Sequence, residues 1–177
     1  IEMAVEVLQR IDCPRFIFTR GTPYHTGVAE DAEDAIAATL ANRYDRQCEI
    51  HDHAFVDVNG CVFDVKHKIG GSQIPHGRHT AVARDRMWNA FWADIDQQPK
   101  GNVYIRSHVH YHSYCGGPGW LAMTLPALQA AATKYGARQC SGTVDYGFCV
   151  FDVDSKGQYE WRAEVARLAE QKATLVK

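Results

Sequence analysis

Two histidines separated by one residue, His108 and His110, follow a short apolar run at residues 103–105. The run is typical of a buried strand, so both imidazoles would leave the end of one strand in the same loop. Neutral imidazole nitrogens bind zinc, manganese, iron and nickel, and two of them can be directed at one point. The spacing therefore indicates a divalent metal site, although a chance pair in a polar loop remains the alternative.

Two further histidines follow strand-like runs. His67 comes after the apolar run at 61–65, and His25 lies in a loop with Gly21 and Pro23 after the run at 15–19. Ligands of open α/β sheets sit beyond the carboxyl ends of the strands, so these histidines are candidates for the same site. A backbone hydrogen bond explains His67 alone equally well, and His25 could instead cap its own loop.

Basic residues lie close in sequence to these histidines: Arg20, Lys66, Lys68, Arg78 and Arg106. They allow a local anion site, and Arg106 could bind a phosphate oxygen or form a structural salt bridge. The formal net charge of the chain is -2, so no general basic field is available to attract nucleic acid.

The composition is that of a soluble globular protein, with 46% hydrophobic and 23% charged residues. No apolar run has the length of a membrane span and no signal peptide is recognisable. The six cysteines form no Cys-x-x-Cys pair, so we expect reduced thiols and a cytoplasmic protein.

The apolar patterns predict one mixed α/β domain over residues 1–177. We expect helices at 1–11, 30–43, 80–97 and 126–135, with the third burying Trp88, Phe91, Trp92 and Ile95. We expect strands at 15–19 and 103–105, and hairpins at 54–65 and 144–165. Asn59-Gly60 predicts a type I′ turn in the first hairpin, and the Gly-rich stretch at 116–119 is expected to be a loop.

The order of the polar segments resembles the calcineurin-like metallophosphoesterases, most closely a divergent group common in phage genomes. The segments that carry the resemblance are RGTPYHTG, DVKHKIGG, IRSHVHYH and GPGWLAMTLP, so it extends from Phe16 to the end of the closing hairpin. It implies a layered sandwich of mixed β-sheets flanked by helices. It also implies metal-dependent hydrolysis of phosphomonoesters or phosphodiesters, with a nucleic acid or nucleotide among the possible substrates.

The resemblance also implies roles for single residues. His67 and His108 would bind one divalent transition metal (manganese, zinc, iron or nickel), and His110 would bind a second. Thr22 stands where the family has a metal-bridging asparagine, and a hydroxyl is a poorer ligand than an amide oxygen. His25 would protonate the leaving group. Apart from the resemblance, Arg20 and Arg106 are candidates to bind the substrate phosphate, because both lie close to these histidines in the sequence.

The first two family motifs, Asp-x-His and Gly-Asp-x-x-Asp, have no counterpart before Phe16. We therefore expect the chain to correspond to the C-terminal half of such a domain. The apolar stripe that starts at Ile1 without a capping residue suggests a start further upstream. The alternative to an enzyme is a non-catalytic, phage-associated remnant that keeps the fold and binds at most one metal ion. The sequence does not fix the oligomeric state, and a phage-encoded chain would act in the host cytoplasm.

Overall fold

A five-stranded mixed sheet forms the centre of the protein, with strand order β3-β4-β5-β7-β6. The structure is a computed structural model and describes residues 1–22, 32–72, 74–129 and 144–166. The three inner strands run parallel, and both edge strands are antiparallel to their neighbours. The strands of this sheet are β3 (His53–Val58), β4 (Cys61–Lys66), β5 (Val103–Arg106), β6 (Ser113–Gly117) and β7 (Trp120–Thr124).

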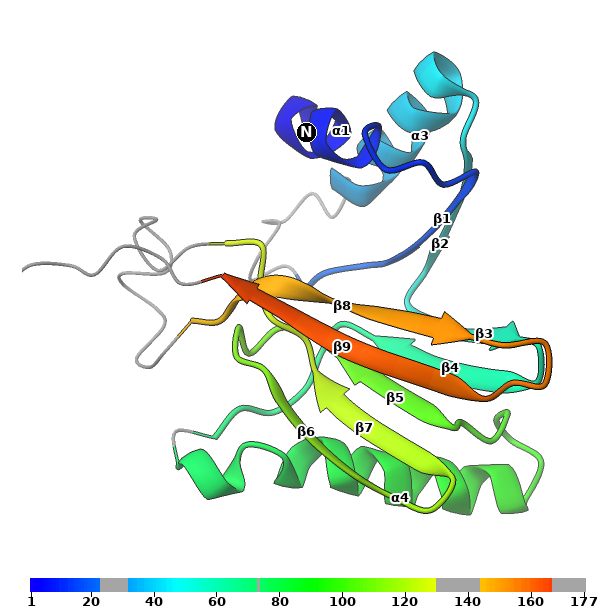
Figure 1. The fold of residues 1–177 in the computed structure, drawn as a ribbon, viewed down its shortest axis with the longest axis vertical. Coiled ribbons are helices and arrows are strands. Elements are labelled where there is room, and N and C mark those ends of the chain that lie inside the picture. Colours follow the sequence, from blue (N-terminus) through cyan, green and yellow to red (C-terminus); the bar gives the residue numbers. More distant parts are fainter. Residues whose placement is uncertain (23–31, 73, 130–143, 167–177) are drawn as a thin grey trace, which may run out of the picture.

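Two layers cover this sheet (Figure 1). The antiparallel hairpin of β8 (Tyr146–Val153) and β9 (Tyr159–Ala166) lies over one face, and helix α4 (Thr80–Asp94) lies along the other. Successive strand residues point to opposite faces, so Ile105 packs toward Phe151 and Trp161, while Tyr104 packs toward Val82 of α4. The apolar inner strands thus bury both faces, as parallel strands normally do.

A smaller unit stands at the top of Figure 1. It consists of the parallel pair β1 (Arg15–Thr19) and β2 (Gln47–His51), together with α1 (Glu2–Leu8) and α3 (Ala32–Tyr44). Strand β2 was not predicted, because its sequence, QCEIH, contains only one large apolar residue. The backbone of Arg20 donates to the carbonyl oxygen of His51, so the pairing extends to the loop after β1.

The first predicted hairpin is confirmed as β3 and β4. Both turn residues have positive φ, 53° at Asn59 and 87° at Gly60, as a type I′ turn requires.

The Gly-rich stretch is not an open loop, because it forms the turn between β6 and β7. There Gly119 has a φ of 76° and a Cβ on Gly116 would lie 3.0 Å from the carbonyl oxygen of Trp120.

The prediction for the aromatic side of α4 was wrong. Trp88, Phe91 and Trp92 are 48%, 55% and 40% exposed. The helix faces the sheet with Val82 and with Asn89, whose side-chain oxygen accepts hydrogen bonds from the backbone of Gly101 and the hydroxyl of Tyr104. Of the helix expected at 126–135, residues 126–129 are not helical and the remainder lies outside the described residues.

Arg106 lies in a buried ion-pair network beneath α4, with 3% of its side chain exposed. Its guanidinium donates to Oδ1 of Asp64 at 2.8 Å and to Asp85 at 2.8 Å, and Nε2 of His53 lies 2.7 Å from the same Oδ1 of Asp64. Burial alone would raise the pKa of Asp64, but the hydrogen bonds from His53 and Arg106 outweigh it and lower the pKa. The salt-bridge alternative therefore accounts for Arg106, whose guanidinium is engaged by Asp64 and Asp85.

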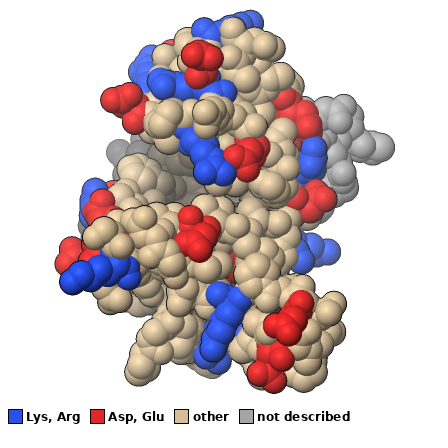
Figure 2. Space-filling view, turned by 90° about the vertical axis from the view of Figure 1, so that its right-hand side faces the viewer, with Lys and Arg blue, Asp and Glu red and all other residues tan. Residues whose placement is uncertain are grey.

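Charges elsewhere are dispersed. Figure 2 shows basic and acidic side chains mixed over one face of the molecule, in keeping with the small net charge. Within the described ranges, no helix combines the length and apolar character that a membrane crossing would need.

We predict that Arg106→Met lowers the free energy of unfolding by about 3–5 kcal/mol at pH 7, because it leaves the Asp64 carboxylate buried without its cation. Chemical denaturation measures this loss. The measurement is made at neutral pH because Asp64 has a lowered pKa in the folded protein. Its carboxylate stabilises the fold fully above the pKa of the unfolded chain, about 3.9, and this contribution is lost as the pH falls through the folded pKa. Arg162→Met, which breaks the exposed pairs to Asp152 and Glu164, is the control and should cost less than about 1 kcal/mol. Equal losses for the two variants would contradict this role.

Candidate metal centre

The carboxyl ends of the three parallel strands meet at one edge of the sheet and surround a pocket of about 340 Å³. His67 follows β4, while Ser107, His108 and His110 follow β5. The other wall comes after β7 and consists of Leu125, Pro126, Ala127, Leu128 and Gln129. The register pairs Lys66 with Arg106, so the next residues leave the two strands at the same level, and the backbone of Ser107 donates to the carbonyl oxygen of His67.

His67 and His108 face each other across this edge. Nε2 of His67 lies 3.3 Å from Nδ1 of His108, and the ring centroids are 5.3 Å apart. Two nitrogens that each lie about 2.0 Å from a tetrahedral metal ion are separated by about 3.3 Å. A hydrogen bond between the rings is the other explanation, but 3.3 Å is long for one. The spacing thus fits two ligands of one metal ion.

The protonation state of the three histidines also suits metal binding. Burial lowers the pKa of His67, His108 and His110. The positive charge of a neighbouring imidazole lowers the pKa of His67 and His110 further, and Lys68 does the same to His108. A lowered pKa keeps the imidazoles neutral at physiological pH, and only a neutral imidazole nitrogen can bind a metal ion.

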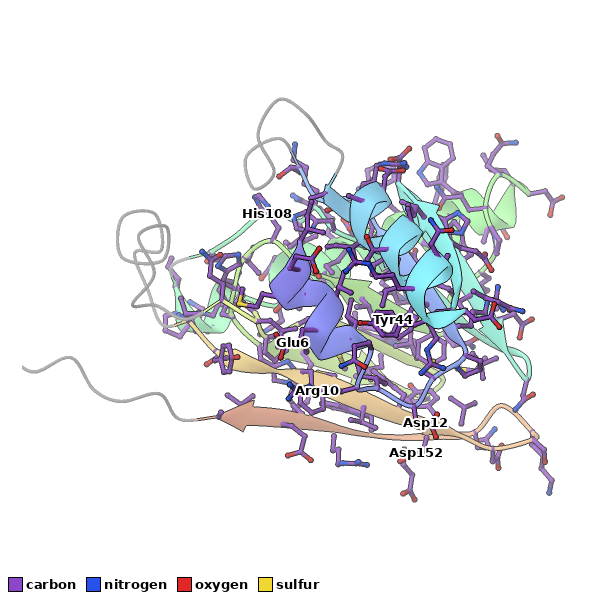
Figure 3. The ribbon with its side chains drawn as sticks, turned by 90° about the horizontal axis from the view of Figure 1, so that it is seen from above. Glu6, Arg10, Asp12, Tyr44, His108 and Asp152 are labelled. Carbon is purple, nitrogen blue, oxygen red and sulfur yellow. The ribbon has the colours of Figure 1, made fainter. Side chains whose placement is uncertain are left out.

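The His-x-His loop has an unusual backbone. His108 and His110 have φ values of 73° and 58°, in the left-handed region that residues other than glycine rarely adopt. The turn is held by the backbone of Val109, which donates to Ser107, and by the backbone of Asp145, which donates to His110. His108 is labelled in Figure 3 and is only partly exposed. Strained residues are concentrated at functional sites, where the surrounding structure holds them in place.

A second, basic pocket of about 180 Å³ shares His67 with the first. Its other lining residues are Arg20, Gly21, Thr22, Asp52, Lys66 and Lys68. Arg20 lies 2.9 Å from Asp34 and 3.9 Å from Asp52, so part of its charge is balanced within the protein. The structure therefore brings Thr22 and Arg20 to His67, whereas Arg106 points to the α4 side of the sheet.

Glu33 is a carboxylate that the sequence did not single out. It lies in the first turn of α3, where it accepts a hydrogen bond from the backbone of Gly21 at 3.0 Å. It is close enough to His67 for its negative charge to raise the pKa of that histidine, against the larger lowering effect of burial. Only the packing of α3 beside β1 brings Glu33 here, and no local sequence pattern signals that.

The described residues contain no cluster of three or more histidine, cysteine, aspartate or glutamate side chains with metal-binding geometry. The geometric pair is thus His67 with His108, and His110 lines the same pocket. His25 lies outside the described residues, so its predicted role as a general acid stays a prediction.

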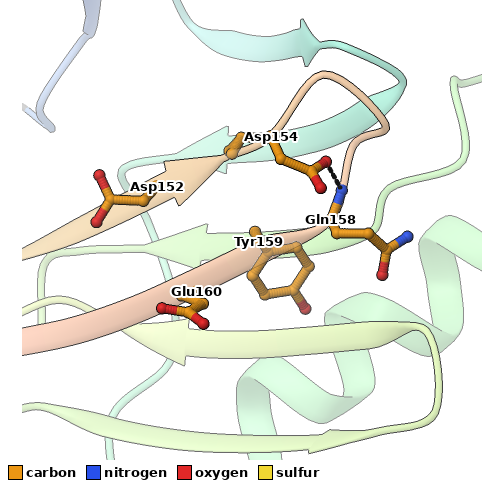
Figure 4. Close-up of a pocket in the computed structure, with 6 residues that line it drawn as sticks. Asp152, Asp154, Gln158, Tyr159 and Glu160 are labelled. Atoms are coloured by element: carbon orange, nitrogen blue, oxygen red, sulfur yellow. Dashed lines mark hydrogen bonds between the residues drawn. The ribbon is translucent and has the colours of Figure 1, made fainter.

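A third pocket lies on the β8–β9 hairpin and has no histidine in its lining (Figure 4). It is lined by Asp152, Val153, Asp154, Gln158, Tyr159 and Glu160. Asp154 accepts hydrogen bonds from the backbone of Lys156 and Gln158, and Asp152 pairs with Arg162. These acidic groups stabilise the hairpin and its turn, so we do not regard this pocket as a functional site.

Solved structures identify the fold, whereas no family model and no curated protein matches the sequence. An archaeal phosphodiesterase aligns over 92% of this chain and 76% of its own, with 13% identity and a TM-score of 0.50. A Vps29 double mutant from Entamoeba histolytica aligns over 94% of this chain and 90% of its own, with 12% identity and a TM-score of 0.50. Wild-type Vps29 from the same organism, in complex with Zn²⁺, aligns over 93% of this chain and 89% of its own, with 11% identity and a TM-score of 0.47.

The chain has the calcineurin-like phosphoesterase fold. The fold class predicted from the sequence, a mixed α/β sandwich with flanking helices, is thereby confirmed. At these identities the likeness shows the fold alone. The phage-type group and the correspondence to a C-terminal half stay predictions.

We predict that His108→Gly is more stable than His108→Ala by about 1 kcal/mol, because only glycine adopts a φ of 73° without strain. Denaturation of the metal-free protein measures the difference. His112, which is not among the residues with positive φ, provides the control. There the order should reverse, with glycine about 0.5–1 kcal/mol less stable than alanine. The same order at both positions would contradict the strained loop.

We predict that the chain binds one Zn²⁺ per molecule and that His67→Gln and His108→Gly each weaken binding by about 100-fold or more, since each removes one ligand. Calorimetric titration at pH 7.5 measures the affinity. His76→Gln should leave it unchanged, because His76 is exposed and lines neither histidine pocket. Equal affinities for the wild type and both ligand variants would rule the site out.

Proposed function

We propose that His67 and His108 bind one divalent transition metal ion and that the centre around them hydrolyses phosphate esters. The observation that carries this proposal is the 3.3 Å separation of Nε2 of His67 from Nδ1 of His108, within a pocket at the carboxyl ends of parallel strands. The fold that the chain shares with an archaeal phosphodiesterase supports the reaction class and favours a phosphodiester.

A bound divalent cation would supply Lewis acidity toward a phosphoryl oxygen and lower the pKa of a water molecule. The chain itself would supply the anion-binding side chains. Lys66 and Lys68 line the basic pocket beside His67, together with Arg20. The ammonium groups of the two lysines and the guanidinium of Arg20 would attract the phosphate and offset its negative charge. Thr22 lines the same pocket and would place a hydroxyl near the substrate.

The pocket on the other side of His67 would hold the rest of the substrate. Its wall after β7 is largely apolar, with Leu125, Ala127 and Leu128, and an apolar wall suits an organic leaving group better than a second phosphate. His110 would bind a second metal ion or orient the substrate from the same loop. His25 remains our candidate for the group that protonates the leaving oxygen.

A non-catalytic module that binds one metal ion is the second candidate. The observation that favours it is the small number of ligands, since the described residues contain no metal-binding group of three. Two metal ions that share a nucleophilic water are the arrangement that clamps both oxygens of an in-line displacement. A chain that holds only one would bind metal and phosphate without turnover.

We predict that the chain hydrolyses bis-p-nitrophenyl phosphate in the presence of Mn²⁺ or Zn²⁺ and that chelation abolishes the reaction. His108→Gly should reduce kcat/KM by about 100-fold or more, because it removes a metal ligand. Lys68→Met should keep its Zn²⁺ affinity and raise KM by about tenfold, because it removes a phosphate contact and no ligand. Release of p-nitrophenolate measures the rates.

Two outcomes would contradict the proposed phosphoesterase activity of this site. If the wild type binds Zn²⁺ through His67 and His108 but turns over neither the diester nor p-nitrophenyl phosphate, the second candidate is correct. If hydrolysis occurs but persists in His108→Gly, the activity belongs to another site or to a contaminant.

A further inference from the structure

Helix α4 and its C-terminal end carry a group of large apolar side chains outside the contact that Val82 makes with the sheet; Trp88 and Trp92 also line a small pocket of about 150 Å³ beside Asp64 and Arg106. Met87, Trp88, Phe91, Trp92 and Ile95 are between 40% and 55% exposed. Trp88 lies 6.1 Å from Phe91 and 6.5 Å from Trp92 between ring centroids, so the rings pack on one another and form one patch. In Figure 1 the helix runs along the lower border of the molecule, and no labelled element lies beyond it.

The main contacts of α4 with the sheet come from other residues than this patch, of which only Trp88 and Trp92 reach a pocket at the border of the sheet. These contacts come from Val82, which is fully buried, and from the hydrogen bonds of Asn89. Asp85 adds its ion pair to Arg106, and Arg86 lies over the ring of Trp120. Because a patch of five large apolar side chains is costly to leave in water, it indicates a surface that another molecule covers.

The row of side chains on this surface permits a symmetric pairing with a second copy. A two-fold axis through the middle of α4, between Asn89 and Ala90, would place a second α4 antiparallel to the first. Trp88 of one copy would then meet Phe91 of the other, and Met87 would meet Trp92, which are the same pairs in both directions. Aromatic and methionine side chains are enriched in the cores of such interfaces.

The charges at the two ends of the patch agree with the same arrangement. Arg84 lies at one end and Asp94 at the other, both are exposed, and neither forms an ion pair within the described part of the chain. Ten residues of helix separate them by about 15 Å, too far for a salt bridge within one copy. In the antiparallel pair each Arg84 would face the Asp94 end of the other helix, at both borders of the patch.

We propose that the exposed face of α4 is the interface of a two-fold homodimer. Five side chains of this size, each about half exposed, present roughly 500 Å² per copy. An interface of about 1,000 Å² in total lies at the lower limit for specific association. The dimer should therefore dissociate in the micromolar range and be in equilibrium with the monomer at ordinary concentrations.

Sedimentation equilibrium of the full chain between about 1 and 200 µM tests the interface. We expect a monomer–dimer equilibrium whose dissociation constant rises at least about tenfold in Phe91→Glu. Phe148→Glu is the matched control, because Phe148 is also 55% exposed but lies on β8, on the other side of the sheet. It should leave the constant unchanged, and circular dichroism verifies that both variants fold.

Exchange of the two charges tests the antiparallel arrangement. Arg84→Asp and Asp94→Arg should each weaken the dimer, and the double variant should regain the wild-type constant, because both cross-copy pairs are restored. A chain that is monomeric at 200 µM would overturn the proposal. A dimer that Phe91→Glu does not affect would place the interface elsewhere, and a double variant as weak as the sum of the single changes would exclude the antiparallel pair.

Discussion

The parallel pairing of β4 with β5 is the constraint on which the candidate site depends. Both strands end at the same edge, and their register pairs Lys66 with Arg106, so the residues that follow face each other. Parallel strands require a crossover connection, and α4 with its flanking segments supplies it. Without this pairing, His67 and His108 would be two unrelated residues 41 positions apart in the sequence.

The buried pair of Asp64 and Arg106 reinforces that register. The guanidinium of Arg106, on β5, donates to both the backbone oxygen and the carboxylate of Asp64, on β4. Since a buried ion pair pays a large desolvation cost, its contribution is mainly to specify one arrangement of the strands. A shift of β5 by one residue would separate Arg106 from Asp64 and would also separate the two histidines. The same residues therefore protect the fold and the geometry of the site.

Much of this arrangement could be predicted from local patterns. The Asn59-Gly60 turn, the apolar runs before His67 and His108, and the placement of chemistry at strand ends all follow from short segments of sequence. Lys66 and Lys68 were likewise candidates for an anion site because they flank His67 in the sequence. The contribution of Glu33 could not be predicted in the same way, since Glu33 reaches the site only because α3 packs beside β1.

Helix α4 shows a second limit of sequence patterns. The spacing of Trp88, Phe91 and Trp92 correctly predicted a helix with an apolar stripe, but it does not say what covers that stripe. The helix packs on the sheet through Val82 and through polar groups, because Asn89 and Asp85 find buried partners there. A polar residue with satisfied hydrogen bonds can thus occupy the inner face and leave the aromatic side chains outside.

The most direct measurement for the central claim is anomalous diffraction from crystals of the Zn²⁺-loaded protein, recorded at the zinc absorption edge. A single metal centre on these histidines predicts an anomalous peak about 2.0–2.1 Å from both Nε2 of His67 and Nδ1 of His108. A map with no peak between these two nitrogens, or with the zinc bound elsewhere while the two rings contact each other directly, would contradict it.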